Sequence, residues 1–457
     1  MKKDLAQGNR MAAEPIPGLL LTMSLPLMFS MVTEALYNVV DSLFISRISE
    51  GAITALSLAF PIQLLVVSIT VGTGVGVGAL LSRLLGEGDG EGVNAVAANG
   101  IFLALLTYAL FLIFGLFFTE SYYASQGAEG EIFRYGVDYL SICMVWSFGG
   151  VGQIIFQRLL QSTGRTALSM LSQLTGALAN IVLDPILIFG LCGAPAMGVK
   201  GAAAATVIGQ IAALALAIFF NLRLNGDISF SVRGFRPRLG IIKRIYAIGA
   251  HAIVMQSLNS LMAFGVNFIL IGFSSTAVAA FGIYIKVQNF VFMPAFGLNN
   301  AVVAIAAFNY GARNEGRVRQ TMKWGMIYAG AIMAAGMLLV QLLALPILRL
   351  FDASPELLSI GSRAMRVISG GYIFVAYMII AQGVYQALGN GLYSLVVTLL
   401  RVVVVLLPLL WGFSLLFPFK EIWWAFVISE IISALVSALL LRRLWAQRFA
   451  PARADMP

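Results

Sequence analysis

The strongest constraint on this chain is its series of long apolar stretches, which recur along nearly its whole length between short polar breaks. Each stretch has about 20 residues or more, the length that an α-helix needs to cross a lipid bilayer. Backbone polar groups must be satisfied internally in a bilayer, so only helices and closed barrels can span it. Barrel strands alternate apolar and polar residues, whereas these stretches are continuous. We therefore predict an all-α polytopic membrane protein.

The stretches predict about twelve transmembrane helices. The composition fits this interpretation, since 60% of the 457 residues are hydrophobic and 11% are charged, whereas about a quarter of the residues in soluble domains are charged. The expected spans are 16–45, 51–82, 93–119, 131–161, 166–190, 199–222, 242–272, 277–309, 320–350, 358–388, 392–416 and 420–445.

The formal net charge of +9 comes from lysines and arginines in short connections and near the two ends. An excess of these residues in short loops marks the cytoplasmic side of a membrane protein. We expect a monomeric, multi-pass protein of the inner (plasma) membrane, in contact with the lipid bilayer and with both termini in the cytoplasm. No basic domain with interleaved aromatic residues is present, so we expect no nucleic-acid partner.

Two segments of the chain repeat at one fixed offset. Residues 55–86 align with residues 280–311, and QSTG at 161–164 aligns with QALG at 386–389. The displacement is the same in both cases, because 311 − 86 = 225 and 386 − 161 = 225. The recurrence of one offset at two separate places indicates that the chain is an internal duplication.

The duplication predicts two homologous six-helix lobes at residues 1–222 and 242–457, joined by a basic cytoplasmic linker at 223–241. Six helices return the chain to its starting side, so the repeats should be parallel and related by an axis along the membrane normal. Transporters built from such repeats commonly bind substrate between them and rock one against the other. The organisation therefore favours transport.

The first span carries a polar stripe. Acidic side chains inside a span cost about 2.5–3.5 kcal/mol at a helix centre, so each one points to a function. Glu34, Asn38 and Asp41 are spaced at i, i+4 and i+7, which places them on one helical face. Tyr37 lies in the same segment, and Pro26 should kink the helix because it cannot donate a backbone hydrogen bond. Apart from Asp41, we assign these residues to a substrate cavity or to bending of this helix.

The fifth span contains Asn180 and Asp184 on one face, followed by Pro185, which leaves the carbonyl of Ile181 without its helical donor. Together with Asp41, these residues indicate a cation site. Two charged carboxylates in a dry site repel each other, so a proton or a sodium ion would stabilise the pair. We predict coupling to H⁺ or Na⁺, with Asp41, Asp184 and Asn180 as the ligands if the ion is sodium, and no other metal.

The remaining charged residues within spans have simpler explanations. Arg401 and Glu430 lie in consecutive spans of the second half and are expected to form a structural ion pair. Asp138, Arg158 and Lys286 lie near span ends, where a long side chain can reach the membrane surface. Such snorkelling is a sufficient explanation for these three residues.

Several chemistries have no support in the sequence. It has no Walker motif for ATP, a single histidine, and two cysteines without the spacing of a disulfide or metal site. We therefore expect no cofactor and no enzymatic activity. An ion gradient is the remaining source of energy for transport.

Three segments together resemble the MATE (multidrug and toxic compound extrusion) family: LYNVVDSLFIS in the first span, SRLLGEGD after the second, and NIVLDPILIFG in the fifth. The duplicated six-helix organisation with a basic central linker also fits, so the resemblance extends over essentially the whole chain. It implies two lobes arranged as a V, a central cavity open to one side, and export of small organic compounds, often cationic drugs.

The resemblance also implies roles for individual residues. The family's cation site would lie at Asp41, Asn180 and Asp184, with Thr206 in the sixth span as an additional hydroxyl position. The family mechanism would be bending of the first helix at Pro26 when Asp41 is neutralised.

One part of the family pattern is missing. NorM-like members carry acids in helices seven and ten, but spans 242–272 and 358–388 contain no Asp or Glu. MepA-like sequences place a glutamate in helix eight, where this chain has Asn299 and Asn300. Coupling should therefore depend on the first lobe alone. The chain is most similar to the DinF-like and MepA-like group.

Two alternatives to drug export stay open. A lipid-linked oligosaccharide or lipid II flippase of the same superfamily would share the fold, although such proteins usually have extra helices or an arginine-rich cavity. An intramembrane prenyl- or acyltransferase would need an Asp-rich diphosphate motif or a histidine-containing catalytic set, and the lone His251 does not supply one. Export coupled to an ion gradient is the favoured function.

Overall fold

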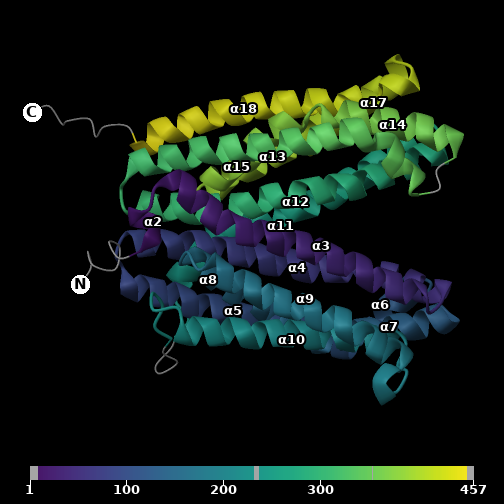
Figure 1. Cartoon of the computed structure of the whole chain (residues 1–457), viewed down its shortest axis with the longest axis horizontal. Helices are drawn as coiled ribbons and strands as arrows, with labels where there is room; N and C mark the ends of the chain where they lie inside the picture. Colours follow the sequence, from purple (N-terminus) through teal and green to yellow (C-terminus); the bar gives the residue numbers. More distant parts are fainter. Residues whose placement is uncertain (1–8, 231–235, 352–353, 450–457) are drawn as a thin grey trace, which may run out of the picture.

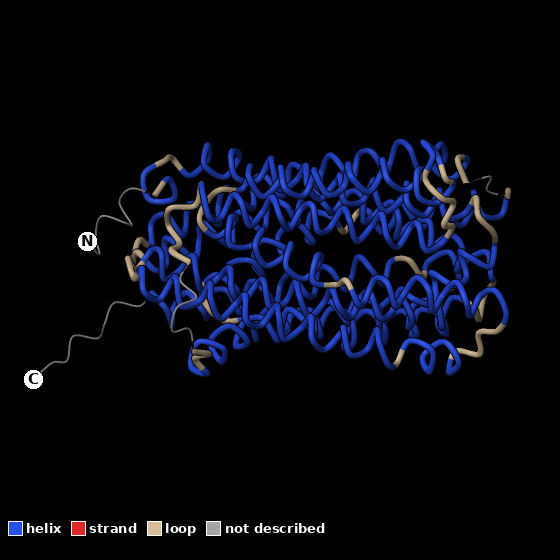
Figure 2. Tube along the Cα trace, turned by 90° about the horizontal axis from the view of Figure 1, so that it is seen from below, coloured by secondary structure: helices blue, strands red, loops and turns tan. Residues whose placement is uncertain are grey.

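The structure is a computed structural model that describes residues 9–230, 236–351 and 354–449. Within these ranges the chain is helical apart from short turns, and no strand occurs in them (Figure 2). The long helices lie side by side along the longest axis of the molecule and gather into two bundles (Figure 1). The predicted all-α fold with two six-helix lobes is confirmed.

The helices of the first half lie mainly in the lower bundle of Figure 1 and those of the second half mainly in the upper one. The first half forms α2 (Arg10–Ala13), α3 (Ile16–Ser46), α4 (Glu50–Gly86), α5 (Gly90–Phe117), α6 (Thr119–Ser125), α7 (Gly130–Val145), α8 (Phe148–Ser162), α9 (Thr166–Phe189), η1 (Leu191–Gly193) and α10 (Val199–Arg223). The second half forms α11 (Leu239–Leu270), α12 (Ser275–Gly311), α13 (Glu315–Arg349), α14 (Pro355–Ser369), α15 (Tyr372–Ala387), α16 (Gly391–Leu399), η2 (Leu400–Leu406), α17 (Leu407–Leu416), η3 (Phe419–Glu421) and α18 (Trp424–Phe449).

Ten of the described helices are long and apolar enough to cross a membrane, and two bent pairs bring the number to twelve. The expected spans 131–161 and 358–388 are the bent ones. The first is broken between α7 and α8 with an angle of 43°, and the second between α14 and α15 with an angle of 50°. The same break therefore occurs at the same place in each half.

The offset of the internal repeat holds for the helix boundaries as well. Helices α4 and α12 begin at Glu50 and Ser275, and α10 and α18 begin at Val199 and Trp424. Both pairs keep the offset of the sequence repeat, since 275 − 50 = 225 and 424 − 199 = 225. The division at 1–222, 223–241 and 242–457 is a finer claim and stays a prediction.

Where the two halves meet, the first long helix of each half packs against the second long helix of the other half. Helix α3 of the first half packs against α12 of the second, and α11 of the second half packs against α4 of the first. At the crossing of α4 and α12, Gly86 lies against the carbonyl of Phe308, and Gly311 lies against the carbonyl of Arg83. Each contact maps onto the other under the offset of the repeat. Such reciprocity indicates a pseudo-two-fold axis between the halves.

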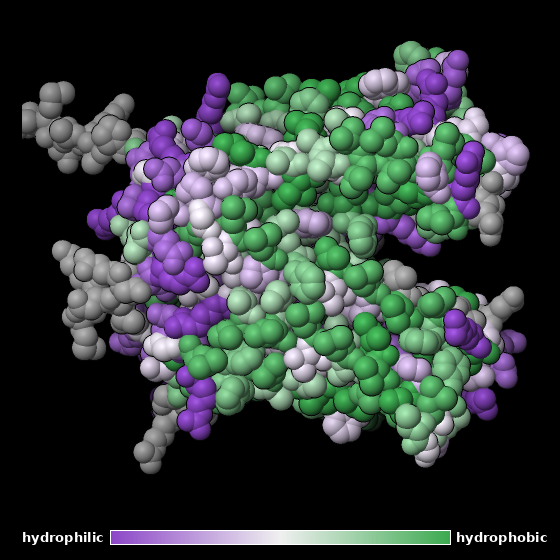
Figure 3. Space-filling view, in the orientation of Figure 1, coloured by the Kyte–Doolittle hydropathy of each residue, from purple (hydrophilic) through white to green (hydrophobic). Residues whose placement is uncertain are grey.

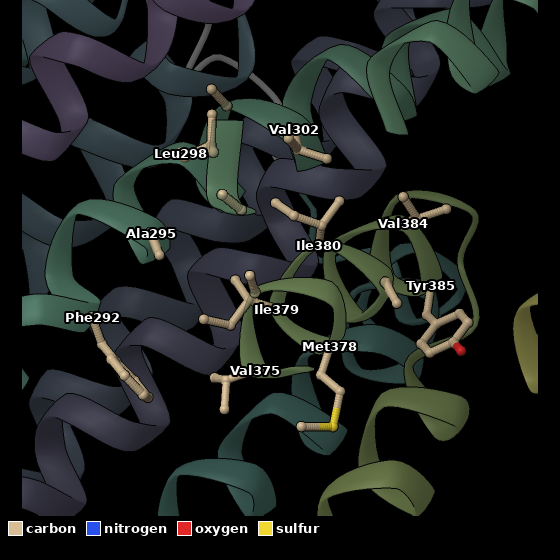
Figure 4. Packing of buried hydrophobic residues seen from close by; sticks show 14 of the residues in the cluster. Phe292, Ala295, Leu298, Val302, Val375, Met378, Ile379, Ile380, Val384 and Tyr385 are labelled. Carbon is tan, nitrogen blue, oxygen red and sulfur yellow. The ribbon is translucent and has the colours of Figure 1, made fainter. Parts of the chain in front are cut away.

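The second half has a dense apolar core between α12 and α15 (Figure 4). Large and small side chains of the two helices interdigitate there, as in other close-packed protein interiors. The residues that meet include Phe292, Ala295, Leu298 and Val302 of α12 and Val375, Met378, Ile379 and Ile380 of α15.

The segment before α3 connects the two bundles. On the second half, Arg317 donates from Nη2 to the backbone oxygens of Met11 and Glu14, both at 2.8 Å. On the first half, Asn9 donates to the carbonyl of Thr163 at 3.5 Å. The side chain of Met11 is fully buried. This segment therefore holds the bundles together at the end of the molecule where α2 lies.

The bundles diverge toward the opposite end. Figure 3 shows a notch between them at the right, away from α2 and the last turn of α18, and its walls are largely apolar. Hydrophilic residues gather mainly at the other end, where the bundles touch. The molecule is thus a V that is closed on the side of the described chain ends.

The glycine contacts at the crossing of α4 and α12 give a stability prediction. A Cβ atom would lie 1.9 Å from the Phe308 oxygen at Gly86 and 2.0 Å from the Arg83 oxygen at Gly311. We expect Gly86→Ala and Gly311→Ala each to destabilise the protein by about 1–3 kcal/mol through overpacking, measured by thermal unfolding in detergent. Gly282→Ala in α12 is the control, since nothing lies within 4 Å of a Cβ atom there. Equal melting temperatures for all three variants would contradict this packing.

Candidate cation site

The two predicted carboxylates meet between α3 and α9, which pack against each other. Asp184 of α9 is fully buried, while Asp41 of α3 keeps partial exposure. Their carboxyl groups lie near enough to interact electrostatically with each other. The Oδ1 atom of Asp41 is buried and has no hydrogen-bond partner among the described residues. Carboxylate oxygens with unused acceptor capacity can take a proton or coordinate a hard cation.

Asn180 and Thr206 complete the group that the sequence predicts. The Nδ2 atom of Asn180, one turn before Asp184 in α9, donates to Asp184 Oδ1 at 3.3 Å. The same atom lies 3.3 Å from the hydroxyl of Thr206 in α10. With the amide turned over, its oxygen accepts from the backbone N–H of Thr206 at 3.2 Å. In either orientation Asn180 links the acidic pair to α10.

Two glycines explain how α10 comes so close to α9. A Cβ atom at Gly209 would lie 2.7 Å from the carbonyl oxygen of Gly176. Without side chains at this crossing the two backbones touch, as small residues allow in membrane helices. Thr206 lies one turn before Gly209, and Asn180 one turn after Gly176. The close crossing therefore brings these two polar residues together.

The other residues of the first-span stripe have different surroundings. Glu34 accepts a hydrogen bond from Nε2 of Gln173 in α9 at 3.1 Å. Tyr37 lies near enough to the acids of α3 and α9 for electrostatic interaction with them. Asn38 belongs to α3, but its side chain lies outside the described residues. Pro26 lies inside α3, which continues from one end to the other, so bending at this proline stays a prediction.

Arg401 and Glu430 form the expected contact in the second lobe. Arg401 donates from Nε and Nη2 to Glu430 Oε1 at 2.9 and 2.6 Å. Arg401 belongs to the π-helical stretch η2, and its backbone oxygen accepts from the hydroxyl of Ser429 at 2.9 Å. The pair is largely buried, with side-chain exposures of 19% and 10%. The arginine neutralises the acid, while the other oxygen of Glu430, Oε2, is buried without a hydrogen-bond partner among the described residues.

Of the three residues assigned to snorkelling, the structure corrects one. Asp138 pairs with Lys200 at 3.3 Å, and Lys286 lies 5.9 Å from the ring centre of Phe351. Arg158, however, is directed between the lobes. Its Nη1 atom donates to Asn300 Oδ1 of α12 at 3.0 Å.

Two of these contacts have no counterpart among the predictions from sequence, namely Arg158 with Asn300 and Glu34 with Gln173. They join residues that are 142 and 139 positions apart in the chain. Local spacing carries no signal for either contact. The internal repeat offers a signal for Arg158, because it marks which helices meet at the pseudo-two-fold axis.

A family model described as MatE matches the chain over two segments, residues 26–186 and 252–411. Each segment covers one repeat, because their starts differ by 252 − 26 = 226 and their ends by 411 − 186 = 225. Together they span more than half of the chain. The chain belongs to the MatE family. It is therefore a multi-pass membrane protein of a multidrug efflux transporter family.

Relatives and solved structures agree with this family. The chain is 27% identical to the multidrug export protein MepA of Staphylococcus haemolyticus over 420 aligned residues. The alignment covers 92% of this chain and 91% of the relative. The chain is 25% identical over 428 residues to MepA of Staphylococcus aureus strain MRSA252, with 93% and 94% covered. The expected similarity to MepA is thus confirmed.

One similar solved structure is an outward-facing multidrug resistance MATE family transporter of the MOP superfamily. It superposes on this chain with a TM-score of 0.90 at 25% sequence identity, and the superposition covers 96% of this chain and 98% of that one. A MATE protein in complex with MaL6 superposes with a TM-score of 0.89 at 25% identity, with the same coverage. Helix arrangement and family are therefore shown over nearly the whole MatE chain.

The Arg401–Glu430 pair gives a prediction about its role. Removing one partner leaves a buried charge unpaired, which costs about 3–5 kcal/mol. We expect Arg401→Met and Glu430→Gln each to lower the melting temperature strongly, and the double variant to lose less than the sum of the two.

The exposed pair Arg363–Glu421, with side-chain exposures of 43% and 31%, provides the control. Surface pairs contribute about 0–1 kcal/mol, so Arg363→Met and Glu421→Gln should have little effect. If Glu430→Gln left the melting temperature unchanged but abolished transport, Glu430 would be a functional acid and the structural role would be wrong.

Proposed function

We propose that this protein is a cation-coupled antiporter, driven by H⁺ or Na⁺, that exports small and often cationic organic compounds across the inner membrane. The observation that carries the proposal is the contact between Asp41 and Asp184, two acids on different helices inside one lobe. An intramembrane acid is a functional candidate by default, and here two of them share one site with an amide and a hydroxyl.

The energetics of the pair supply the coupling. Two carboxylates in a dry site cannot both stay charged cheaply. An entering proton removes one of the two negative charges, and an entering sodium ion offsets one of them while it is coordinated by oxygens of Asp41, Asp184 and Asn180. Either event favours a close approach of α3 to α9, while the loss of the cation disfavours it.

The position of α3 connects this site to the other lobe. The face of α3 that carries Asp41 meets α9, and the same helix also packs against α12 of the second half. A change in how α3 lies on α9 therefore changes the contact between lobes. A ligand shifts a conformational equilibrium only through differential affinity for its two states, and the acidic pair offers such a difference.

The compounds would be released through the notch between the lobes, whose walls are largely apolar (Figure 3). Similar relatives are described as multidrug export proteins. With both termini in the cytoplasm, the notch faces the outside, as in an outward-open state. Glu34 would contribute a negative charge for cationic substrates. The flippase alternative has less support, since no arginine-rich cavity accompanies the fold in the described part.

The test is efflux from proteoliposomes that contain purified protein, under an imposed pH gradient or an imposed sodium gradient. We expect Asp41→Asn and Asp184→Asn each to lower gradient-driven efflux of a cationic dye at least tenfold, because an amide cannot exchange a proton or balance Na⁺. Glu34→Gln should do less and alter which cations are accepted.

Asp138→Asn serves as the matched control, since Asp138 is an acid of the same lobe that pairs with Lys200 away from the site. It should transport normally. Full efflux by either the Asp41 or the Asp184 variant would place coupling elsewhere. The gradient that drives efflux in the unchanged protein identifies the coupling ion.

A further inference from the structure

A polar pocket lies where the two lobes meet, between α4, α8, α12 and α15. Its polar lining residues are Arg158, Gln161, Ser162, Asn300 and Gln386, and small residues of α4 form another wall. Among these lining residues Arg158 is the one that carries a charge. The pocket is separate from the acidic pair, because it lies between lobes and not within one.

The pocket is built on the pseudo-two-fold axis. Gln161 and Gln386 both line it and are equivalent under the offset of the repeat, and so are Val75 and Asn300. Residues from equivalent positions therefore face each other across the axis. Arg158 breaks the symmetry, because its equivalent in the second half is Gly383. The first half therefore contributes a positive charge to the pocket at a position where the second half has a glycine.

The walls of the pocket are shaped to hold this side chain. A Cβ atom at Gly74 would lie 2.9 Å from Cγ of Arg158. The aliphatic part of the arginine therefore packs directly on the backbone of Gly74, where a larger residue would displace it. The mirror position shows the converse, because Gly383 leaves room for the side chain of Asn299. The arginine is therefore held in place by packing and does not extend toward the membrane surface.

The hydrogen bonds of the guanidinium leave it able to bind more. Nη1 donates to Gln161 Oε1 at 3.1 Å and to Asn300 Oδ1 at 3.0 Å. Both acceptors are neutral amides, and both bonds use the same nitrogen. An arginine presents five N–H donors in a fork that fits a carboxylate with two parallel bonds. Glu34 of α3 acts on this cation electrostatically, while the two hydrogen bonds described above go to amides. An anion that accepts hydrogen bonds from the guanidinium further offsets the cost of burying the charge.

We propose that Arg158 binds the carboxylate of a transported organic compound at the floor of the notch. This inference rests on the proposed export function and narrows its substrates to include zwitterions, with the carboxylate on Arg158 and the cationic group toward Glu34 of α3. Glu34 is the acid whose charge acts on Arg158.

Binding at this point would also act on the contact between lobes. Arg158 belongs to the first half and Asn300 to the second, so their hydrogen bond crosses the interface. A carboxylate that takes Nε and Nη2 in a two-bond fork draws the guanidinium toward itself and so weakens the bond from Nη1 to Asn300. The substrate would thus weaken a contact that holds the lobes together at the closed end.

The test uses two dyes that differ in one group: rhodamine B, which carries a free carboxylate beside its cationic ring system, and its ethyl ester, which lacks the carboxylate charge. Binding to full-length protein in detergent is measured by fluorescence polarisation without any gradient. Arg158→Gln should weaken rhodamine B binding at least tenfold, and change binding of the ester less than twofold. Arg158→Lys keeps the charge without the fork and should lie between these values.

Several results would overturn the proposal: equal weakening for both dyes, no weakening for either, or no binding of rhodamine B to the unchanged protein. If Arg158→Gln does not fold, Arg158→Lys provides the test. The proposal then requires that Arg158→Lys weaken binding of rhodamine B more than binding of its ethyl ester. Asp41→Asn separates this inference from the proposed function. Asp41→Asn should bind both dyes but fail to transport them. If it transports them, the proposed coupling through Asp41 is wrong, while the proposed binding of a carboxylate by Arg158 is unaffected.

Discussion

Helix α3 is the part of the structure on which the rest depends, because it packs on both lobes at once. It contacts α9 within its own half and α12 in the other half. One face of the helix carries Asp41, which reaches Asp184, while glycine-lined contact with α12 brings its backbone within reach of Gly297. The same helix therefore joins the acidic site to the interface between the lobes, which is the route by which the proposed coupling would act.

The lobes have the same helices but use their buried charges differently. In the second lobe Glu430 is already neutralised by Arg401, with both donors on one oxygen. In the first lobe Asp41 and Asp184 have each other and an amide. A closed ion pair has no reason to take up a cation, whereas two acids do. The two halves share one helical framework, and the difference in side-chain chemistry is the reason for proposing the cation site in the first lobe.

Much of this could be predicted from the sequence, for a physical reason. Spans follow from apolar length, and the i, i+4 spacing of Asn180 and Asp184 fixes their common face. The meeting of Arg401 with Glu430 could be expected because lone buried charges are costly. The partner of Arg158 could not be predicted from local spacing, because Asn300 lies on a helix of the other lobe and the contact of α8 with α12 brings them together. Long-range contacts of this kind leave no local pattern.

Polar contacts join the two halves in the described part of the chain. They include the Arg158–Asn300 hydrogen bond, the bonds from Arg317 and Asn309 to the backbone at Met11 and Glu14, and the bond from Tyr328 to the carbonyl of Pro17. A hydrogen bond contributes about 0.5–1.5 kcal/mol net, and more when one partner is charged. Opening the closed end of the V therefore costs several kcal/mol in hydrogen bonds, besides the loss of packing at the glycine crossing. A tenfold difference in affinity supplies about 1.4 kcal/mol, so a cation and a substrate that each discriminate tenfold between the two states offset part of this cost, and new contacts in the other state must supply the rest.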